Sequence, residues 1–332
     1  ADLPHFLDDH PGADRPGDIR YLCKFVRPHI GVVTAVGEIP VHIEFFKSRE
    51  RLAKEKSALV SCLAEQGKAV LDVDDSLVWE MRKKSKAKVI GFGFGPEAEI
   101  RASEIVYQLP SFEHGQWLNL PSKVFFKIDY QGSTVPFFLT NIIVDYQLRP
   151  ILAAIAVGLA FGMNLVEISN LIRKYQPLAG RMRLLPGIKN TLLIDDSYNA
   201  SPKATLAAIK SLEKIKAGRK IVVLGDMLEL GRQTEKAHRQ VGAQAASVAD
   251  LFFAVGQRMR FAVEEAEKQG MAKEKIFVFD KNQKAKLALQ QQLKEGDLVL
   301  IKGSQGMRME KVTHEIMAEP ERAGELLVRQ EH

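Results

Sequence analysis

The sequence predicts an α/β protein of two domains, and three observations support this. Its 332 residues are about the length that two ordinary domains need. In the second half, apolar runs rich in β-branched residues alternate with helical patterns over short connections, which is typical of βαβ units and a mostly parallel sheet. Between residues 98 and 139, short β-rich pieces separated by turn signals predict hairpins attached to a mixed sheet.

The first half combines these two patterns. We expect strands at 31–36, 69–73 and 88–91, and helices at 49–66, 77–84, 150–161 and 165–174. Residues 176–187 contain two prolines and two glycines, so this segment is the best candidate for a linker. The predicted domains are therefore 1–178 and 179–332.

The second half reads as a regular alternation of strands and helices. Strands are expected at 191–194, 220–224, 251–255, 276–279 and 297–301, and helices at 202–215, 235–248, 258–269, 284–294 and 306–317. The strand cores show no polar alternation, which is typical of strands that are buried on both faces. A helix-covered sheet is therefore expected here.

The composition excludes several classes of protein. With 46% hydrophobic residues, 27% charged residues and two cysteines, the chain is not collagen-like, disordered or a disulfide scaffold. The two cysteines are compatible with a reducing compartment. The longest apolar run, 151–166, is shorter than the roughly 20 residues of a membrane span. The net charge of +6 suits a nucleotide, a phosphate or a nucleic acid, but an ordinary basic protein has the same charge.

Polar side chains follow three of the predicted strands. The stretches are LIDDSYNASP at 193–202, VLGDMLELG at 223–231 and IKGSQGMRME at 301–310. In open α/β sheets, ligands bind at the carboxyl ends of the strands, and backbone N–H groups at a helix start favour anions. One such residue alone would be explained as a helix cap. Three polar strand ends on one edge instead favour a binding site.

Glycine-rich stretches give a weaker signal. The phosphate-loop pattern G-x-x-x-x-G-K-[ST] does not occur in the sequence. The stretch GFGFGPEA at 91–98 is similar to a dinucleotide-binding turn, but no helical pattern follows it. We therefore interpret it as a loop.

A cluster of ionisable residues stands out in the first half. His42 and Glu44 come just after a predicted strand. Lys56 lies on the same face of the following helix as Leu52 and Leu59. A lysine on an apolar face either extends its ammonium group to water or is buried, modified or linked to a metal. The spacing alone leaves both possibilities open.

Several stretches together resemble the Mur ligase family. In the second half these are AGRM, LIDDSYNASP, VLGDMLELG and IKGSQGMRME; in the first half they are DRPGDIRYL, VRPHIGVVTAVG, HIEFF, ERLAKEKSALV and AVLDVDD. The resemblance covers about residues 12–315, with the motifs in the family's order. It implies an N-terminally incomplete central ATPase domain followed by a Rossmann-like C-terminal domain.

The resemblance also implies an activity. Family members use ATP to phosphorylate a substrate carboxylate, and an incoming amine attacks the acyl phosphate to form an amide. The branch that the motifs resemble most adds D-Ala-D-Ala to a UDP-MurNAc-peptide during peptidoglycan precursor synthesis in the cytoplasm. The expected cofactors are ATP and Mg²⁺, and neither nucleic acid binding nor membrane insertion is expected.

The resemblance assigns roles to individual residues. His42 matches a histidine that ligates Mg²⁺, and Lys56 matches a lysine that is carbamylated in many Mur ligases. Arg181 matches an arginine that contacts ATP, and Asp196 matches an aspartate that meets the nucleotide ribose. Asn199 belongs to the same signature as Asp196.

Other positions are assigned by their place in the family pattern. Lys302 and Ser304 lie where the C-terminal domain of the family faces the nascent peptide end. Where the family has a histidine and asparagines that hold adenine, this chain has Tyr146, Gln147 and Pro150. Gln147 can still form a hydrogen bond with adenine, whereas Pro150 cannot.

Two parts of the family pattern have no counterpart here. The UDP-sugar domain and the phosphate loop are missing, and His10 stands where the family has a metal-binding glutamate. We therefore expect a truncated ligase that is inactive by itself. The alternatives are a non-catalytic protein that kept the fold to bind a nucleotide or a partner, and one half of a split ligase.

Overall fold

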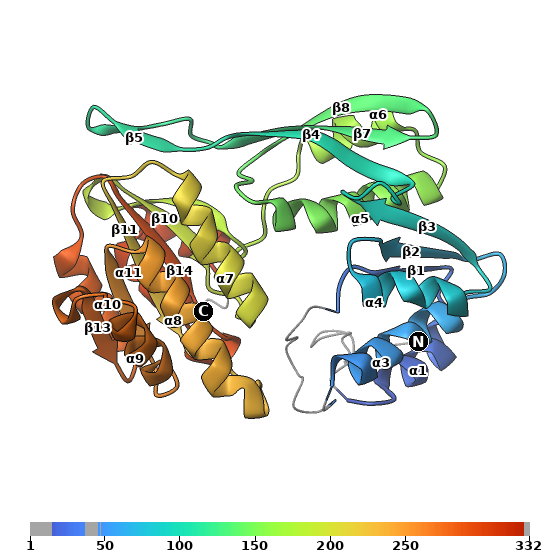
Figure 1. Ribbon diagram of the computed structural model, residues 1–332. Helices are drawn as coiled ribbons and strands as arrows, with labels where there is room; N and C mark the ends of the chain where they lie inside the picture. The colour runs from blue at the N-terminus through green and yellow to red at the C-terminus, as the bar shows by residue number, and fades with distance from the viewer. Residues whose placement is uncertain (1–14, 37–45, 47, 329–332) are drawn as a thin grey trace. The chain divides into compact units, whose positions relative to one another are not determined.

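The computed structural model describes residues 15–36, 46 and 48–328, which fall into two compact units (Figure 1). Unit 1 runs up to Ile105 and includes Phe126–Phe137 and Tyr146–Ile172. Unit 2 takes in Val106–Phe125, Phe138–Asp145 and the chain from Arg173 onward. Each unit is built around a six-stranded sheet, so the predicted α/β class is confirmed. In the described part of the chain, no helix combines the length and the hydropathy needed to cross a bilayer.

The sheet of unit 1 has the strand order β1-β2-β3-β4-β7-β8, with parallel pairing from β1 to β4. Its strands are β1 (Ile30–Val33), β2 (Lys68–Asp72), β3 (Lys88–Gly93), β4 (Ile100–Gln108), β7 (Lys123–Tyr130) and β8 (Ser133–Thr140). Tyr130 and Ser133 are joined by Gln131 and Gly132, which both have positive φ, at 47° and 76°. Two such residues form the turn that connects adjacent antiparallel strands, as the hairpin pattern predicted.

Three of the four helices predicted in unit 1 are shorter than the apolar periodicity indicated, and the fourth, predicted at 150–161, begins two residues earlier. The helices of unit 1 are α1 (Asp18–Val26), α3 (Arg49–Ser61), α4 (Ser76–Trp79), α5 (Leu148–Ala160) and α6 (Leu165–Ile172). The expected helix 49–66 ends at Ser61 because the chain then turns, with Lys68 N donating to His29 O where β2 joins β1. The expected helix 77–84 is α-helical only in α4 and continues as a 3₁₀ helix, Glu80–Lys84.

A short second hairpin belongs to unit 2, although it follows β4 directly in the sequence. It consists of β5 (Ser111–Glu113) and β6 (Gln116–Leu118). Phe112 N donates to Lys216 O at 2.9 Å, and the indole Nε1 of Trp117 donates to Asn190 O at 3.1 Å. These contacts attach the hairpin to the C-terminal half of the chain.

The sheet of unit 2 has the order β13-β12-β11-β14-β10-β9 and is parallel except for β9. Its strands are β9 (Arg183–Gly187), β10 (Thr191–Asp196), β11 (Arg219–Gly225), β12 (Leu251–Val255), β13 (Ile276–Phe279) and β14 (Asp297–Lys302). We expected residues 183–187 to lie in the linker, and that expectation was wrong. Pro186 marked the segment as a turn, but an edge strand tolerates a residue that cannot donate to the ladder.

Two groups of helices cover this sheet (Figure 1). The helices are α7 (Pro202–Ser211), α8 (Thr234–Val248), α9 (Arg260–Lys268), α10 (Asn282–Gln292), α11 (Glu310–Ile316) and α12 (Ala323–Leu326). One core cluster joins Leu193 and Ile301 of the sheet to Leu289 of α10 and Val312 of α11. Since side chains alternate along a strand, Asp195 follows Leu193 onto this face and Asp196 points to the opposite face.

Candidate functional site

The strongest candidate site lies at the carboxyl edge of the sheet in unit 2. Asp195 and Asp196 end β10, and Lys302 ends β14. The two strands are parallel neighbours, with Asp196 paired in register with Lys302. The structure thus brings together two of the three polar strand ends that the sequence singled out.

Asp196 and Lys302 form a buried ion pair. The Lys302 Nζ lies 2.6 Å from Asp196 Oδ2 and also donates to Asn199 O at 2.9 Å. Asp196 Oδ1 accepts from Met182 N at 3.2 Å. The side chains of Lys302 and Asp196 are only 2% and 5% exposed. Burial raises the pKa of Asp196, while Lys302 and Arg181 oppose that rise and favour the carboxylate.

Asp195 occupies the other face of the same strand. Its Oδ1 accepts a hydrogen bond of 3.0 Å from Thr313 Oγ1 of α11. The side chain is fully buried, and this burial raises the pKa of Asp195 to about 6. Adjacent carboxylates therefore differ in surroundings, since Asp196 faces a lysine and Asp195 faces a neutral hydroxyl.

Arg181 is exposed beside this ion pair. Its guanidinium carbon lies 4.1 Å from the centre of the Tyr198 ring, a cation–π contact. Gly180 has φ of +68°, and a Cβ there would lie 2.9 Å from Tyr198 N, so a larger residue would disturb this contact. The side chain of Asn199 accepts from Ala200 N at 2.8 Å, which fixes the turn before α7.

Ser304 holds the loop that follows β11. Its Oγ accepts from Leu228 N at 2.8 Å, and its own N–H donates to Asp226 O at 3.1 Å. The neighbouring Met227 N donates to His238 Nε2 at 3.1 Å. This loop is the remaining polar strand end, 223–231, that the sequence singled out, whereas the contribution of His238 could not be predicted from the sequence.

His238 is held as a neutral imidazole. It is fully buried in α8, and its Nδ1 lies 2.7 Å from Thr234 O, which requires a proton on Nδ1. Its Nε2 is then free to accept from Met227 N. Burial lowers the pKa of His238, which favours this neutral form.

In unit 1, Lys56 is half-buried on α3. Its Nζ donates to Ala35 O, just beyond β1, at 2.7 Å. Burial lowers the pKa of Lys56, and the carboxylate of Asp75 opposes this. Asp75 in turn accepts from Val36 N at 2.8 Å. His42 and Glu44, the expected neighbours of Lys56, lie outside the described residues.

A second acidic strand end lies in unit 1, in the stretch AVLDVDD, and no role was predicted for its aspartates. Asp72 is fully buried at the end of β2 and pairs with Arg149 of α5. Asp74 accepts from Phe94 N and Gly95 N, both at 2.9 Å. Burial raises the pKa of Asp72, and Arg149 opposes that rise.

The structure says less about the predicted adenine-binding residue, Gln147, and about the predicted metal ligands. Gln147 is 8% exposed, at the end of a short 3₁₀ helix before α5. Among the residues that the structure describes, no group of three or more histidine, cysteine, aspartate or glutamate side chains could hold a metal ion. The Mg²⁺ prediction depends on His42 and is therefore not tested.

Two family models match the chain. The Mur ligase middle domain matches residues 12–158, and the glutamate ligase domain of Mur ligases matches residues 180–305. Together they cover most of the chain in the expected order, so the resemblance found in the sequence is confirmed.

Relatives with these domains are longer than this chain. UDP-N-acetylmuramoyl-tripeptide–D-alanyl-D-alanine ligase of Bacillus subtilis (strain 168) is 27% identical over 311 residues, which are 93% of this chain and 64% of that protein. The protein of the same name from Mycobacterium leprae is 30% identical, over 88% of this chain and 59% of its own length. The chain therefore spans less than two thirds of these relatives.

Solved structures agree with these matches. MurF from Acinetobacter baumannii superimposes with a TM-score of 0.75 at 26% identity, over 91% of this chain and 62% of that one. MurF ligase from Thermotoga maritima, solved in complex with ADP, gives a TM-score of 0.72 at 26% identity, over 93% and 66%.

Proposed function

The chain belongs to the Mur ligase family, and we propose that it supplies the middle and C-terminal parts of an ATP-dependent amide ligase of peptidoglycan precursor synthesis. The proposed reaction joins D-Ala-D-Ala to a UDP-MurNAc-peptide through an acyl phosphate in the cytoplasm. The main support for this proposal is that one edge of the unit 2 sheet brings together Arg181, Tyr198, Asp196 and Lys302.

This arrangement suits a nucleoside phosphate. Arg181 is exposed and always charged, so it can bind a phosphate oxygen while its other face rests on Tyr198. Each oxygen of Asp196 already accepts one hydrogen bond and has a second lone pair for a ribose hydroxyl. Asn199 fixes the turn beside this carboxylate. Within unit 1, and by the family pattern alone, we propose Gln147 as a hydrogen-bonding partner for adenine.

Lys302 and Ser304 are proposed to shape the face that meets the growing peptide. Lys302 is engaged with Asp196 and Asn199, and Ser304 is engaged with Leu228. Their contacts support a role in holding two strand-end loops in place rather than in direct binding. The peptide would then meet the loop backbone that these side chains fix.

Mg²⁺ would neutralise the charge of the transferred phosphoryl group. We propose His42 as its ligand and a carbamate of Lys56 as its anionic support. The lowered pKa of Lys56 fits this role, since CO₂ reacts with the neutral amine and releases one proton. A carbon-13 carbamate signal from the chain under labelled CO₂ with Mg²⁺, absent in Lys56→Arg, would support the assignment.

Nucleotide binding by the full chain provides the main test. Titration with ADP should give saturable binding, and Arg181→Met should weaken it about tenfold because one charged contact is lost. Arg232→Met is the control, since Arg232 is an exposed arginine of the same unit. If wild type binds no ADP, the chain is better explained as a non-catalytic remnant of the fold.

We also propose that this chain alone does not turn over ATP. The sequence has no G-x-x-x-x-G-K-[ST] loop, whose N–H groups and lysine hold the β- and γ-phosphates. Phosphate release in the presence of both substrates should therefore stay at background. Release that depends on the substrates would contradict the proposal, whereas release restored by a second polypeptide carrying such a loop would indicate a split ligase.

The domain boundary at residues 178 and 179 remains a proposal as well. The chain from 179 to 332 holds all six strands of the unit 2 sheet and should melt cooperatively. It would lack the β5–β6 hairpin, including the contact of Trp117 with Asn190.

A further inference from the structure

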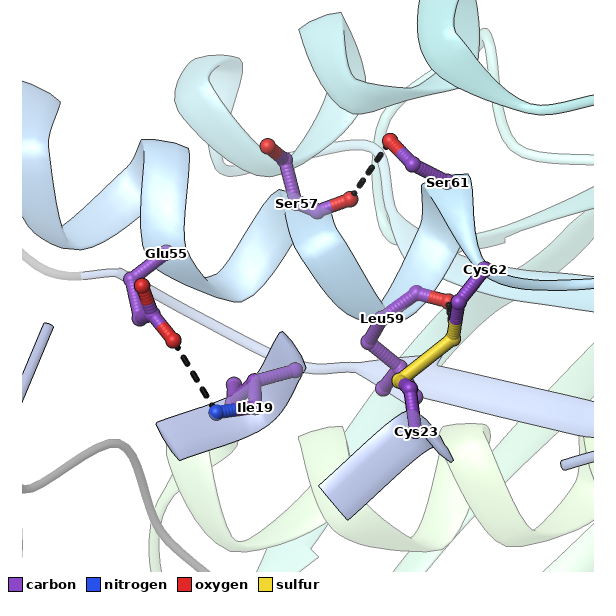
Figure 2. The surroundings of a disulfide bond; sticks show 7 residues. All are labelled: Ile19, Cys23, Glu55, Ser57, Leu59, Ser61 and Cys62. Carbon is purple, nitrogen blue, oxygen red and sulfur yellow. Dashed lines mark hydrogen bonds between the residues drawn. A yellow bond between two sulfur atoms is a disulfide. The ribbon is translucent and has the colours of Figure 1, made fainter. Parts of the chain in front are cut away.

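Helix α1 is linked covalently to the end of α3. Figure 2 shows the disulfide between Cys23 of α1 and Cys62, the residue that caps α3. The two Cα atoms are 6.4 Å apart, and 39 positions separate the residues in the sequence. Together these two account for both cysteines of the chain.

Apart from this link, α1 is weakly attached. None of its nine residues is buried, and Tyr21, Phe25 and Val26 are 61%, 68% and 62% exposed. A helix of this length has little stability of its own. Its other attachments are Ile19, which packs against the core of unit 1, and Glu55. The Glu55 carboxylate accepts from Gly17 N at 2.9 Å and from Ile19 N at 3.0 Å, and Figure 2 shows the bond with Ile19.

The disulfide is open to reagents in solution. Cys62 is exposed and Cys23 is half-buried. Arg20 and Lys24 flank Cys23 on α1, and nearby cations favour an approaching thiolate. Disulfides of this accessible kind in reducing compartments are typically transient and redox-sensing rather than structural.

We propose that Cys23 and Cys62 form a reversible redox modification site whose co-reactant is a dithiol reductant. A thiolate of the reductant attacks the exposed Cys62 sulfur, forms a mixed disulfide with it and releases Cys23 as a thiolate, which takes up a proton. The second thiol of the reductant then displaces Cys62. The protein gains two electrons and two protons as two thiols, and the reductant leaves as a disulfide.

Reduction opens α1 without unfolding the layer beneath it. The inner face of α3 is anchored by Leu52, Ala53 and Val60, which belong to the core of unit 1 and do not depend on the disulfide. Glu55 and the packing of Ile19 are what still hold α1 once the sulfurs separate. The oxidised chain therefore keeps α1 docked, and the reduced chain exposes the segment around it.

Thiol trapping on the full chain tests whether the site exists. The chain is oxidised with glutathione disulfide, alkylated under denaturing conditions and digested without reductant. We expect a cross-linked peptide pair containing Cys23 and Cys62, which disappears after treatment with dithiothreitol and returns after reoxidation. Recovery of both cysteines as alkylated thiols after oxidation would overturn the proposal.

Hydrogen exchange then tests whether reduction of the disulfide loosens α1. Dithiothreitol should speed exchange of the α1 amides about tenfold or more, because closure of a loop of this size strongly restrains its ends. Amides of β2 should not change. In the double variant Cys23→Ser with Cys62→Ser, the α1 amides should exchange as fast as in the reduced wild type, and dithiothreitol should not change their rate. Equal α1 exchange in oxidised and reduced wild type would overturn the proposal.

A matched control separates the disulfide from general loosening of α3. Ser61 lies next to Cys62 and bonds only within its own helix, to Ser57 O at 3.0 Å (Figure 2). Ser61→Ala should keep the full response of α1 to dithiothreitol. Loss of that response in Ser61→Ala would mean that the change reports fraying of α3, which would also count against the proposal.

Discussion

In each sheet, a parallel strand ends in a buried aspartate that pairs with one basic side chain, but the two ion pairs differ in how far they are closed to solvent. In unit 2, Asp196 pairs with Lys302, whose side chain is 2% exposed. In unit 1, Asp72 pairs with Arg149, whose side chain is 31% exposed. An aspartate at the end of a strand thus pairs with a cation in both units, but the cation is almost fully buried in unit 2 and partly exposed in unit 1.

This difference in solvent exposure determines whether each cation can still bind a further group. Lys302 donates to Asp196 and to Asn199 O, so most of its hydrogen-bonding capacity is used inside the protein. Arg149 pairs with Asp72, lies 3.7 Å from Asp74 and 5.5 Å from the Phe94 ring centre, and still reaches water. We infer that the first pair fixes a geometry, whereas the second can adjust to an anion from outside.

Removing the lysine should give the largest effect. Lys302→Met leaves Asp196 buried without its ion-pair partner and with only the exposed Arg181 as a nearby cation. This should lower the free energy of unfolding by about 3–5 kcal/mol. Urea denaturation at neutral pH measures this. The double variant Asp196→Asn with Lys302→Met should recover much of the loss. A single variant as stable as wild type would show that the pair is not closed to water.

The sequence predicted the sheet of unit 2 well because its strands are buried on both faces. Their apolar runs give a strong signal that does not depend on tertiary contacts. β9 was missed, since Pro186 and Gly187 indicated a turn and the pairing with β10 depends on the folded sheet. In unit 1 the helix over 49–66 was predicted too long, because the start of β2 beside β1, not local propensity, ends it at Ser61.

The candidate site was predictable only in part. The motifs located Asp196 and Lys302, but their pairing across 106 positions follows from β10 and β14 being neighbours. Arg149 and Asp72 are 77 positions apart. Asp72 lies in the stretch AVLDVDD, but no role was assigned to it, and Arg149 belongs to no motif. The role of His238 on α8 could not be predicted, because it depends on a hydrogen bond from the backbone N–H of Met227 in the loop after β11.

The second largest effect should appear with pH and concerns Asp195. Unfolding returns its pKa from about 6 to the ordinary 3.8, so between these values only the folded state holds the proton. This contribution is complete below pH 3.8 and is lost as the pH rises through 6, by about 3 kcal/mol in total. Asp195→Asn should remove this loss.

The measurement is the difference in unfolding free energy between Asp195→Asn and wild type from pH 4 to pH 8.5. It should shift in favour of the variant as the pH rises and become flat above pH 7. A difference that does not change with pH would mean that water reaches this carboxyl group, and the contrast in enclosure between the units would then shrink.

Arg149→Met tests the more open cluster. Asp72 loses its partner, but the exposed part of Arg149 gives water a route to the carboxylate, so the cost should be about 2 kcal/mol, less than for Lys302. Lys83→Met is the control, because Lys83 pairs with Glu80 on the surface and its loss should not be measurable. A cost equal to that of Lys302→Met would remove the distinction between the two clusters.

The smallest effect should come from Thr313, which bonds Asp195. Thr313→Val removes a donor to a carboxylate that is ionised above pH 6, so it should cost about 1.5 kcal/mol at pH 7.5 and about half of that at pH 4.5. Thr191→Val is matched, since Thr191 is also buried on β10 and donates to the neutral Ile188 O at 2.9 Å. Its cost should be the same at both pH values. If the two variants share one pH dependence, the ionised form of Asp195 gains nothing from Thr313, and its burial must be relieved by another group.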